Sequence, residues 1–361
     1  MLILVSAFAA TYFWKAWHFG YSDWVAAVGW GLTIPLMYAI GLLLGRNVDR
    51  HVRVEAWRFS AFLTGLSYVS GATLFVFLTV VQRYSVADAL AEDYFKLIPS
   101  VWSGTLINRT SLGAFASLGM CLIGVLLFWR NIATLKHGSL LVALIALCVA
   151  LGSYSNIVLA NRSPVIAMAL SFTVCWCLWV TNAPWTRMLS TAAILTALAF
   201  PIYAWWTSVA DQIARLYIVG RVLDEGLDTA GRVSSWIAMS SNLFTYTDGG
   251  RLADIAGNTY VHNLWLDVAW DAGLMAFCLL IAFHFSHLPS LLRVTVTAKR
   301  SSLGIFLVAM SISFFANFMQ EPTLAASPLY FSVSCLFLGF TYRLSLPPRR
   351  TLAVDSVTPH D

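Results

Sequence analysis

Apolar segments long enough to cross a lipid bilayer recur along nearly the whole chain, and they limit the possible folds more than any other feature. Of the 361 residues, 59% are hydrophobic and only 11% are charged. A soluble domain carries roughly a quarter charged residues, so the sequence predicts an all-α polytopic membrane protein. About ten spans are expected, because each apolar core becomes a span of about 20 residues once its flanks are included. The cores are residues 2–17, 32–44, 59–81, 112–129, 140–151, 165–180, 189–206, 264–285, 303–318 and 329–340.

The predicted organisation is a single transmembrane domain over residues 1–349, followed by a disordered cytoplasmic tail over residues 350–361. The first core lacks the basic region and the small-residue cleavage pattern of a signal peptide, so it is expected to be retained as a span. The six cysteines all fall within apolar segments and lack metal-ligand spacing. They are interpreted as small buried hydrophobic residues.

The distribution of basic residues predicts which side of the membrane each loop faces. More than half of the 22 basic residues lie in alternate short loops, which are expected to be cytoplasmic together with both termini. These residues are Arg46, Arg50, Arg53, Arg58, Arg130, Lys136, Arg187, Arg293, Lys299, Arg300, Arg343, Arg349 and Arg350. The outward segments are then 18–24, 82–109, 153–163, 207–261 and 320–328.

Two outward segments have helical patterns of their own. Residues 85–98 place apolar and charged side chains on opposite stripes, which predicts a short helix on the bilayer surface. Residues 207–261 are too long for a simple connector and are expected to be functional. Within them, residues 211–225 have an apolar stripe, and Asp228 is a candidate cap for a second helix that runs through Arg232 and Trp236.

The point at which this long loop enters the next apolar segment carries an unusual set of polar side chains. Asn263, Asp267 and Asp271 follow one another at i, i+4 spacing, so they share one helix face. Carboxylates in an apolar segment are costly and usually mark a polar cavity or a proton pathway. His262 begins this face and can titrate near neutral pH. An ordinary interfacial histidine is the alternative interpretation.

Arginines on the outward side point to an anionic ligand. Arg109 and Arg162 lie at outward ends of spans, in a stretch from residue 94 to residue 210 that contains no Asp or Glu. The planar guanidinium suits phosphate or carboxylate. A salt bridge to a distant acid such as Asp211 or Glu321, or snorkelling, is the alternative. Arg232 in the long loop has the further alternative of a simply solvated side chain.

Three of these segments, in this order, resemble the O-antigen ligase/polymerase superfamily of bacterial inner-membrane glycosyltransferases. Asn161-Arg162-Ser163 before an apolar span is similar to the family's arginine flanked by small residues. Gly231-Arg232 followed by Trp236 is similar to its Gly-Arg-x-x-x-Trp motif. His262-Asn263-x-x-Leu266-Asp267, with Gly273 beyond, is similar to its His-Asn-x-x-Leu-acid signature. The resemblance covers roughly residues 104–339. The chain departs from the family in its smaller predicted number of spans and in Pro164, where the family often has a small residue.

The resemblance implies a C-type glycosyltransferase-like architecture and a reaction on the periplasmic face. A glycan leaves an undecaprenyl diphosphate carrier and joins a sugar hydroxyl of an acceptor, without metal, cofactor or nucleotide sugar. The acceptor is either lipid A-core or a second carrier-linked glycan. His262 is then the candidate general base, Asp267 its orienting residue, and Arg162 and Arg232 the diphosphate ligands. Arg109, Asn263 and Arg221 are secondary candidates.

The residues themselves are compatible with that reaction, because no outward cluster of Asp and Glu suits a divalent metal. Membrane lipid is an expected partner and nucleic acid is not. Two other classes stay open: a transporter or flippase for the same lipid-linked glycan, with the intramembrane carboxylates as a proton relay, and a structural or assembly subunit. The sequence does not distinguish a ligase from a polymerase, and it does not identify the sugar, the linkage or the oligomeric state.

Overall fold

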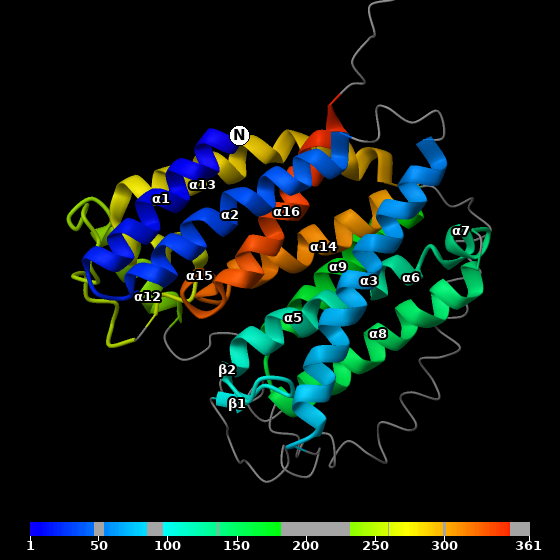
Figure 1. The fold of residues 1–361 in the computed structure, drawn as a ribbon, viewed down its shortest axis with the longest axis horizontal. Helices are drawn as coiled ribbons and strands as arrows, with labels where there is room; N and C mark the ends of the chain where they lie inside the picture. Colours follow the sequence, from blue (N-terminus) through cyan, green and yellow to red (C-terminus); the bar gives the residue numbers. More distant parts are fainter. Residues whose placement is uncertain are drawn as a thin grey trace, which may run out of the picture.

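The computed structural model of the protein describes residues 1–46, 54–84, 97–135, 137–181, 232–258, 260–298 and 301–346, and these are mostly helical (Figure 1). Within them the only sheet is an antiparallel pair, β1 (Leu97–Pro99) with β2 (Leu106–Asn108). The helices are α1 (Leu2–His18), α2 (Trp24–Arg46), α3 (Val54–Val81), α5 (Arg109–Cys121), α6 (Ile123–Leu126), α7 (Trp129–Ala133), α8 (Gly138–Leu159), α9 (Ser163–Val180), α12 (Arg232–Asn242), α13 (Leu264–Ala298), α14 (Ser302–Phe318), α15 (Thr323–Ala326) and α16 (Pro328–Ser345).

The helices confirm the general class predicted from the sequence. Six helical segments in the described residues are long and apolar enough to cross a membrane: Trp24–Gly45, Arg58–Val81, Arg109–Leu126, Gly138–Leu159, Ser163–Val180 and Leu264–Val296. α14 is a shorter apolar helix. The chain is therefore a mostly helical, multi-pass membrane protein. The predicted core at residues 189–206 lies outside the described residues.

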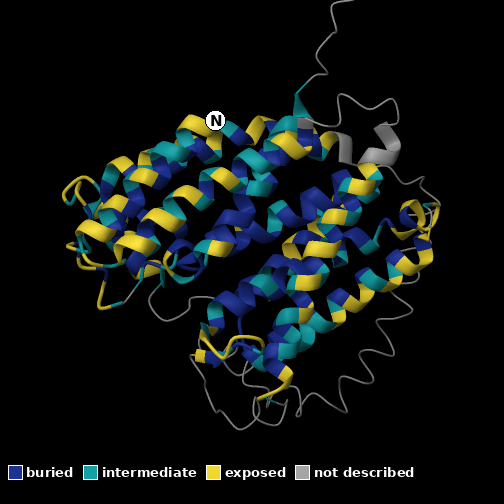
Figure 2. Ribbon diagram, in the orientation of Figure 1, coloured by how far each residue is buried: buried dark blue, intermediate teal, exposed yellow. Residues whose placement is uncertain are grey.

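The helices pack with their buried residues toward one another and their exposed residues on the outside (Figure 2), and many of the exposed residues are apolar. Ile3 is 86% exposed and Leu32 is 66% exposed, as expected for residues that face lipid. Inside, α2 lies along α16, and α1 lies between α2 and α13. A Cβ atom on Gly41 would lie 2.1 Å from the carbonyl oxygen of Leu336, so the α2 and α16 backbones approach each other too closely for any larger residue.

α13 is interrupted at Gly273, and the chain that follows α12 fills the interruption. Gly273 has φ 85° and ψ −177°, a conformation open to glycine alone. The N–H of Leu274 donates to the carbonyl of Thr247 (2.8 Å), and the N–H of Arg251 donates to the carbonyl of Trp270 (2.9 Å). These bonds satisfy backbone groups that the break would otherwise leave unpaired. The glycine therefore allows the segment that follows α12 to be anchored to α13.

The structure corrects one prediction and leaves others untested. The C-terminal end of the predicted surface helix is wrong, because Leu97 and Ile98 belong to β1 and Ile98 pairs with Ile107. Ile98 is 2% exposed, so its burial against neighbouring residues outweighs the helical stripe. The rest of that helix, the predicted helix at 211–225, the Asp228 cap and the tail at 350–361 lie outside the described residues. The predicted helix through Arg232 and Trp236 is present as α12.

Candidate functional site

α12 holds the chain that leads to His262. The indole N–H of Trp236 donates to the carbonyl of Val261 (2.9 Å), and the hydroxyl of Ser235 donates to the carbonyl of Ile255 (3.0 Å). Val261 is fully buried. Arg232 precedes Trp236 by four residues and so lies on the same helix face. The Gly-Arg-x-x-x-Trp pattern thus has a local explanation: its tryptophan fixes the residue before His262, and its arginine lies one turn away.

Asp267 fixes the backbone on both sides of His262. Its Oδ1 accepts the N–H of Val261 (2.8 Å), and its Oδ2 accepts the N–H of Asn263 (3.0 Å). Asn263 caps the start of α13 in return, because its side chain accepts the N–H of Leu266 (3.3 Å). Asp267 is only 4% exposed. Both of its oxygens therefore bind main chain, so any effect of Asp267 on the His262 side chain passes through the peptide backbone.

His262 has an unusual backbone conformation and a neutral side chain. Its φ is 61°, in the left-handed region that few residues other than glycine adopt. Burial, together with the positive charge of Arg232, lowers the pKa of His262 to about 4. Its Nδ1 is buried and has no hydrogen-bond partner among the described residues. At neutral pH the imidazole is therefore uncharged and able to accept a proton.

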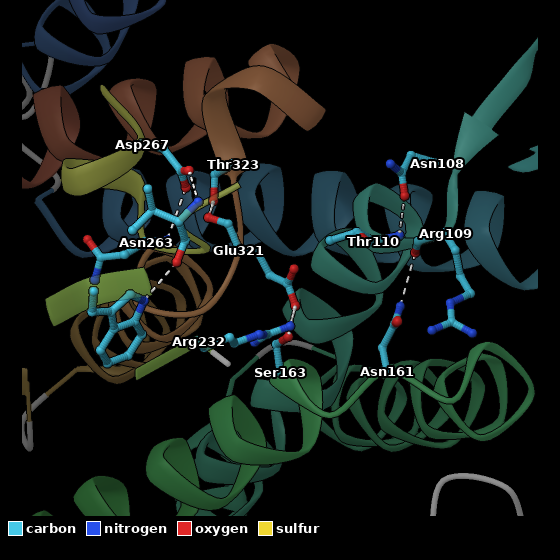
Figure 3. Close-up of polar contacts among 12 residues, drawn as sticks. Asn108, Arg109, Thr110, Asn161, Ser163, Arg232, Asn263, Asp267, Glu321 and Thr323 are labelled. Carbon is cyan, nitrogen blue, oxygen red and sulfur yellow. Dashed lines mark hydrogen bonds and ion pairs between the residues drawn. The ribbon is translucent and has the colours of Figure 1, made fainter. Parts of the chain in front are cut away.

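Arg232 shares a carboxylate with the start of α9. An Nη atom of Arg232 lies 3.6 Å from Oε1 of Glu321, and the hydroxyl of Ser163 donates to the same oxygen. The side chains of Arg232 and Glu321 are 22% and 11% exposed. Figure 3 shows these three side chains converging from separate elements. Arg232 is therefore not the simply solvated loop arginine that the sequence left open.

This contact brings two of the sequence-predicted segments together. Ser163 is the first residue of α9, and Arg162 stands at the N-cap position directly before it. The segment that carries Arg162 and the helix that carries Arg232 thus meet at Glu321. The sequence offered Glu321 only as a distant partner for Arg162 or Arg109. The sequence did contain a signal that singled out Glu321 as a partner for these arginines, because it is the only acidic residue between Asp271 and Asp355.

Arg109 lies in a different part of the structure from Arg232. It is the first residue of α5 and is 8% exposed. Its carbonyl accepts the side-chain N–H of Asn161 (3.0 Å), and in Figure 3 its guanidinium lies beyond Asn161 from the Arg232–Glu321 pair. Asn161 thus ties the start of α5 to the turn before α9. The other secondary candidate, Arg221, lies outside the described residues.

Asp271, the deepest acid on the α13 face, belongs to a separate network. Its Oδ1 lies 2.8 Å from Nε of Arg251, and its Oδ2 accepts the hydroxyl hydrogen of Tyr12 (2.8 Å). The guanidinium of Arg251 also lies over the ring of Tyr21, 4.1 Å from its centroid. In this network the pKa of Arg251 is raised: burial opposes the rise, and the charge and hydrogen bond of Asp271, together with Tyr260 and Tyr21, outweigh it. Asp271 therefore joins α1, the segment between α12 and α13, and α13 itself.

Among the residues that the structure describes, no three His, Cys, Asp or Glu side chains are grouped as a metal site would need. No protein-family model matches the sequence, and no curated protein matches it.

Proposed function

We propose that the protein is a metal-independent glycosyltransferase that moves a glycan from undecaprenyl diphosphate to a sugar hydroxyl of an acceptor. The observation that carries the proposal is a neutral, partly buried histidine that lies within the electrostatic influence of a cation, His262 near Arg232. The Asn161-Arg162-Ser163 segment supports it, because Ser163 and Arg232 bind the same carboxylate. Three segments that resemble one family in sequence thus contribute to one region of the structure.

In the proposed reaction, His262 takes the proton from the acceptor hydroxyl as that oxygen attacks the anomeric carbon of the glycan. The new glycosidic bond forms while the bond from that carbon to the diphosphate oxygen breaks. The carrier diphosphate leaves with the bonding electrons, and Arg232 and Arg162 stabilise its developing charge. A base in this position contributes typically 10²–10⁴-fold to the rate.

Glu321 has a defined role in this scheme as the counterion of Arg232 before the donor binds. Its 3.6 Å contact with Arg232 is longer than the ~2.7–2.9 Å of a close charge-assisted hydrogen bond. A diphosphate carries more charge than one carboxylate and matches the guanidinium fork at least as well. The donor can therefore displace Glu321 from Arg232, while Ser163 continues to hold the carboxylate.

The proposal includes an orientation in the membrane. With the basic loops cytoplasmic, the protein has about ten spans in the bacterial inner membrane and both termini are inside. His262, Arg232 and Glu321 then lie on the periplasmic side, where lipid-linked glycans are joined to their acceptors. The acceptor is lipid A-core for a ligase, or a second lipid-linked glycan for a polymerase.

A transporter or flippase for the lipid-linked glycan is the alternative that the intramembrane carboxylates favour. Their contacts weaken it, because Asp267 binds the N–H groups of Val261 and Asn263 and Asp271 is paired with Arg251. A proton relay needs groups that exchange partners, whereas both of these carboxylates hold elements of the fold together.

Reconstitution tests the proposal against this alternative. The purified protein is placed in liposomes with lipid-linked glycan donor and an acceptor, and free undecaprenyl diphosphate and the joined glycan are measured. Covalent transfer with release of the carrier supports the proposal. Movement of intact donor between leaflets without any new glycosidic bond would show that the protein is a transporter instead of an enzyme.

A deletion strain distinguishes a ligase from a polymerase. Lipopolysaccharide that consists of core only indicates a ligase, and core with one repeat indicates a polymerase.

A further inference from the structure

A polar cavity of about 530 Å³ lies at the other end of α14 from the Arg232–Glu321 pair. Its walls come from the first turns of α3, from α7 with the turn after it, and from the start of α14 (Figure 1). α14 is 17 residues long, so the cavity is about 25 Å from Glu321 along the helix axis. It is therefore separate from the proposed transfer site, and no residue assigned to that site lines it.

Among the described residues that line this cavity, the charged side chains are all basic. Arg58 from α3 and Arg130 from α7 both line it, although they are far apart in sequence. None of the described residues in its lining is acidic. Asn131 and Ser302 add neutral groups that can donate hydrogen bonds. Two arginines on independent elements, with neutral donors between them, form a site suited to a phosphate group.

The N-terminus of α14 adds to this field. Ser301 caps the helix, and its hydroxyl accepts the N–H of Gly304 (3.0 Å). Ser301, Ser302 and Leu303 all line the cavity, so the positive end of the helix dipole is directed toward it. The cavity thus combines side-chain cations with a favourable backbone dipole.

The surroundings of the cavity are those of a membrane interface. Trp129 is 50% exposed, and the guanidinium carbon of Arg130 lies 5.5 Å from its ring centroid. Exposed tryptophan beside arginine is typical of the level at which lipid headgroups lie. The floor of the cavity is apolar, with Phe62 1% exposed and Leu303 4% exposed. A ligand with a phosphate at one end and an apolar body at the other fits this arrangement.

We propose that this cavity binds the phosphate headgroup of an anionic membrane phospholipid. The volume is in the range of small-ligand sites, ~300–1,000 Å³, and is sufficient for a headgroup without its acyl chains. Free phosphate shares the same chemistry. The lipid is favoured because the apolar floor and the interfacial tryptophan can contact the apolar part of a lipid, which a fully hydrated phosphate ion lacks. The proposal is independent of the glycosyltransferase reaction.

Native mass spectrometry of the purified full-length protein tests the site. The wild type, the double variant Arg58→Gln/Arg130→Gln and the control Arg293→Gln are titrated with phosphatidylglycerol and with phosphatidylethanolamine. Arg293 is a matched control, because it lies on the same predicted side of the membrane and contacts the carbonyl of Ser345 rather than the cavity. Each interfacial cation contributes roughly a fivefold effect on binding of an anionic lipid, so the double variant is expected to bind phosphatidylglycerol on the order of 30-fold more weakly.

The outcomes separate the possibilities. Preferential retention of phosphatidylglycerol by the wild type and by Arg293→Gln, with loss in the double variant, supports the proposal. Equal binding by all three proteins, or equal retention of the zwitterionic lipid, would overturn it. Inorganic phosphate is added in a separate arm. If it binds the wild type but not the double variant and no lipid is retained, the phosphate chemistry stands and the lipid source is wrong. The melting temperature of the double variant is compared with that of the wild type to verify that the variant is folded.

Discussion

Asp267→Asn separates a positioning role from a chemical one at the centre of the site. Asp267 accepts two buried main-chain N–H groups, those of Val261 and Asn263. An asparagine keeps one acceptor oxygen and turns an NH₂ group toward the other N–H, so at least one buried donor loses its partner. That loss costs about 1–3 kcal/mol. If this whole free-energy cost is expressed as a misplaced His262 in the transition state, kcat falls about 5- to 150-fold.

The pH dependence of transfer shows which role is correct. The pKa of His262 is lowered to about 4, so the base is deprotonated and active at neutral pH, and kcat/KM is expected to fall as the pH drops through about 4. Loss of a positioning residue lowers the rate at every pH but does not shift the pH at which kcat/KM falls. Asp267→Asn is therefore expected to give a lower curve of the same shape, measured as initial rates in the reconstituted assay.

Asp248→Asn is the matched control. The side chain of Asp248 is 84% exposed and forms only a surface contact with Lys15 (3.3 Å), so its loss is expected to change the rate little. Two results would refute the positioning argument. One is a rate for Asp267→Asn equal to the wild type. The other is disappearance of the acidic limb in Asp267→Asn, which would make Asp267 the proton acceptor.

Three further predictions test the remaining parts of the account. Arg232→Lys is expected to lose nearly as much activity as Arg232→Ala, because lysine lacks the bidentate fork. Arg83→Lys is the control, because Arg83 is exposed and lies on the same predicted side of the membrane. Full activity of Arg232→Ala would exclude the diphosphate role. Activity with purified lipid-linked donor is expected to survive excess EDTA, and a loss restored specifically by magnesium or manganese would contradict this. Single cysteines at positions 248 and 298 of a cysteine-free protein are expected to react with an impermeant reagent from outside only at 248; labelling at 298 would reverse the orientation.

The helices were predictable because their signals are local. Apolar length alone located the six helical segments that are long enough to cross a membrane, and α12 was expected from the chain around Arg232 and Trp236. The bonds of Asp267 to Val261 and Asn263 are also local, since they join residues four and six positions apart. Spacing placed these residues together but did not show that the carboxylate would bind main chain instead of the imidazole.

The contacts between distant segments were not predictable from one sequence. Glu321 and Ser163 are separated by 158 positions, and Tyr12 and Asp271 by 259. Their pairing depends on how α1, α9 and α13 pack, which periodicity does not specify. The strand at Leu97–Pro99 was missed for a related reason, because its burial depends on a partner strand and on neighbouring helices rather than on its own pattern.

The central claim is that His262 is the general base, and the rate of transfer by His262→Ala tests it most directly. His18→Ala is the control, because His18 is an exposed histidine of the same predicted side that stacks on Trp14. His262→Ala is expected to bind lipid-linked donor with wild-type affinity, to transfer glycan about 10²–10⁴-fold more slowly, and to lose the fall in rate near pH 4. Transfer by His262→Ala at close to the wild-type rate would contradict the claim.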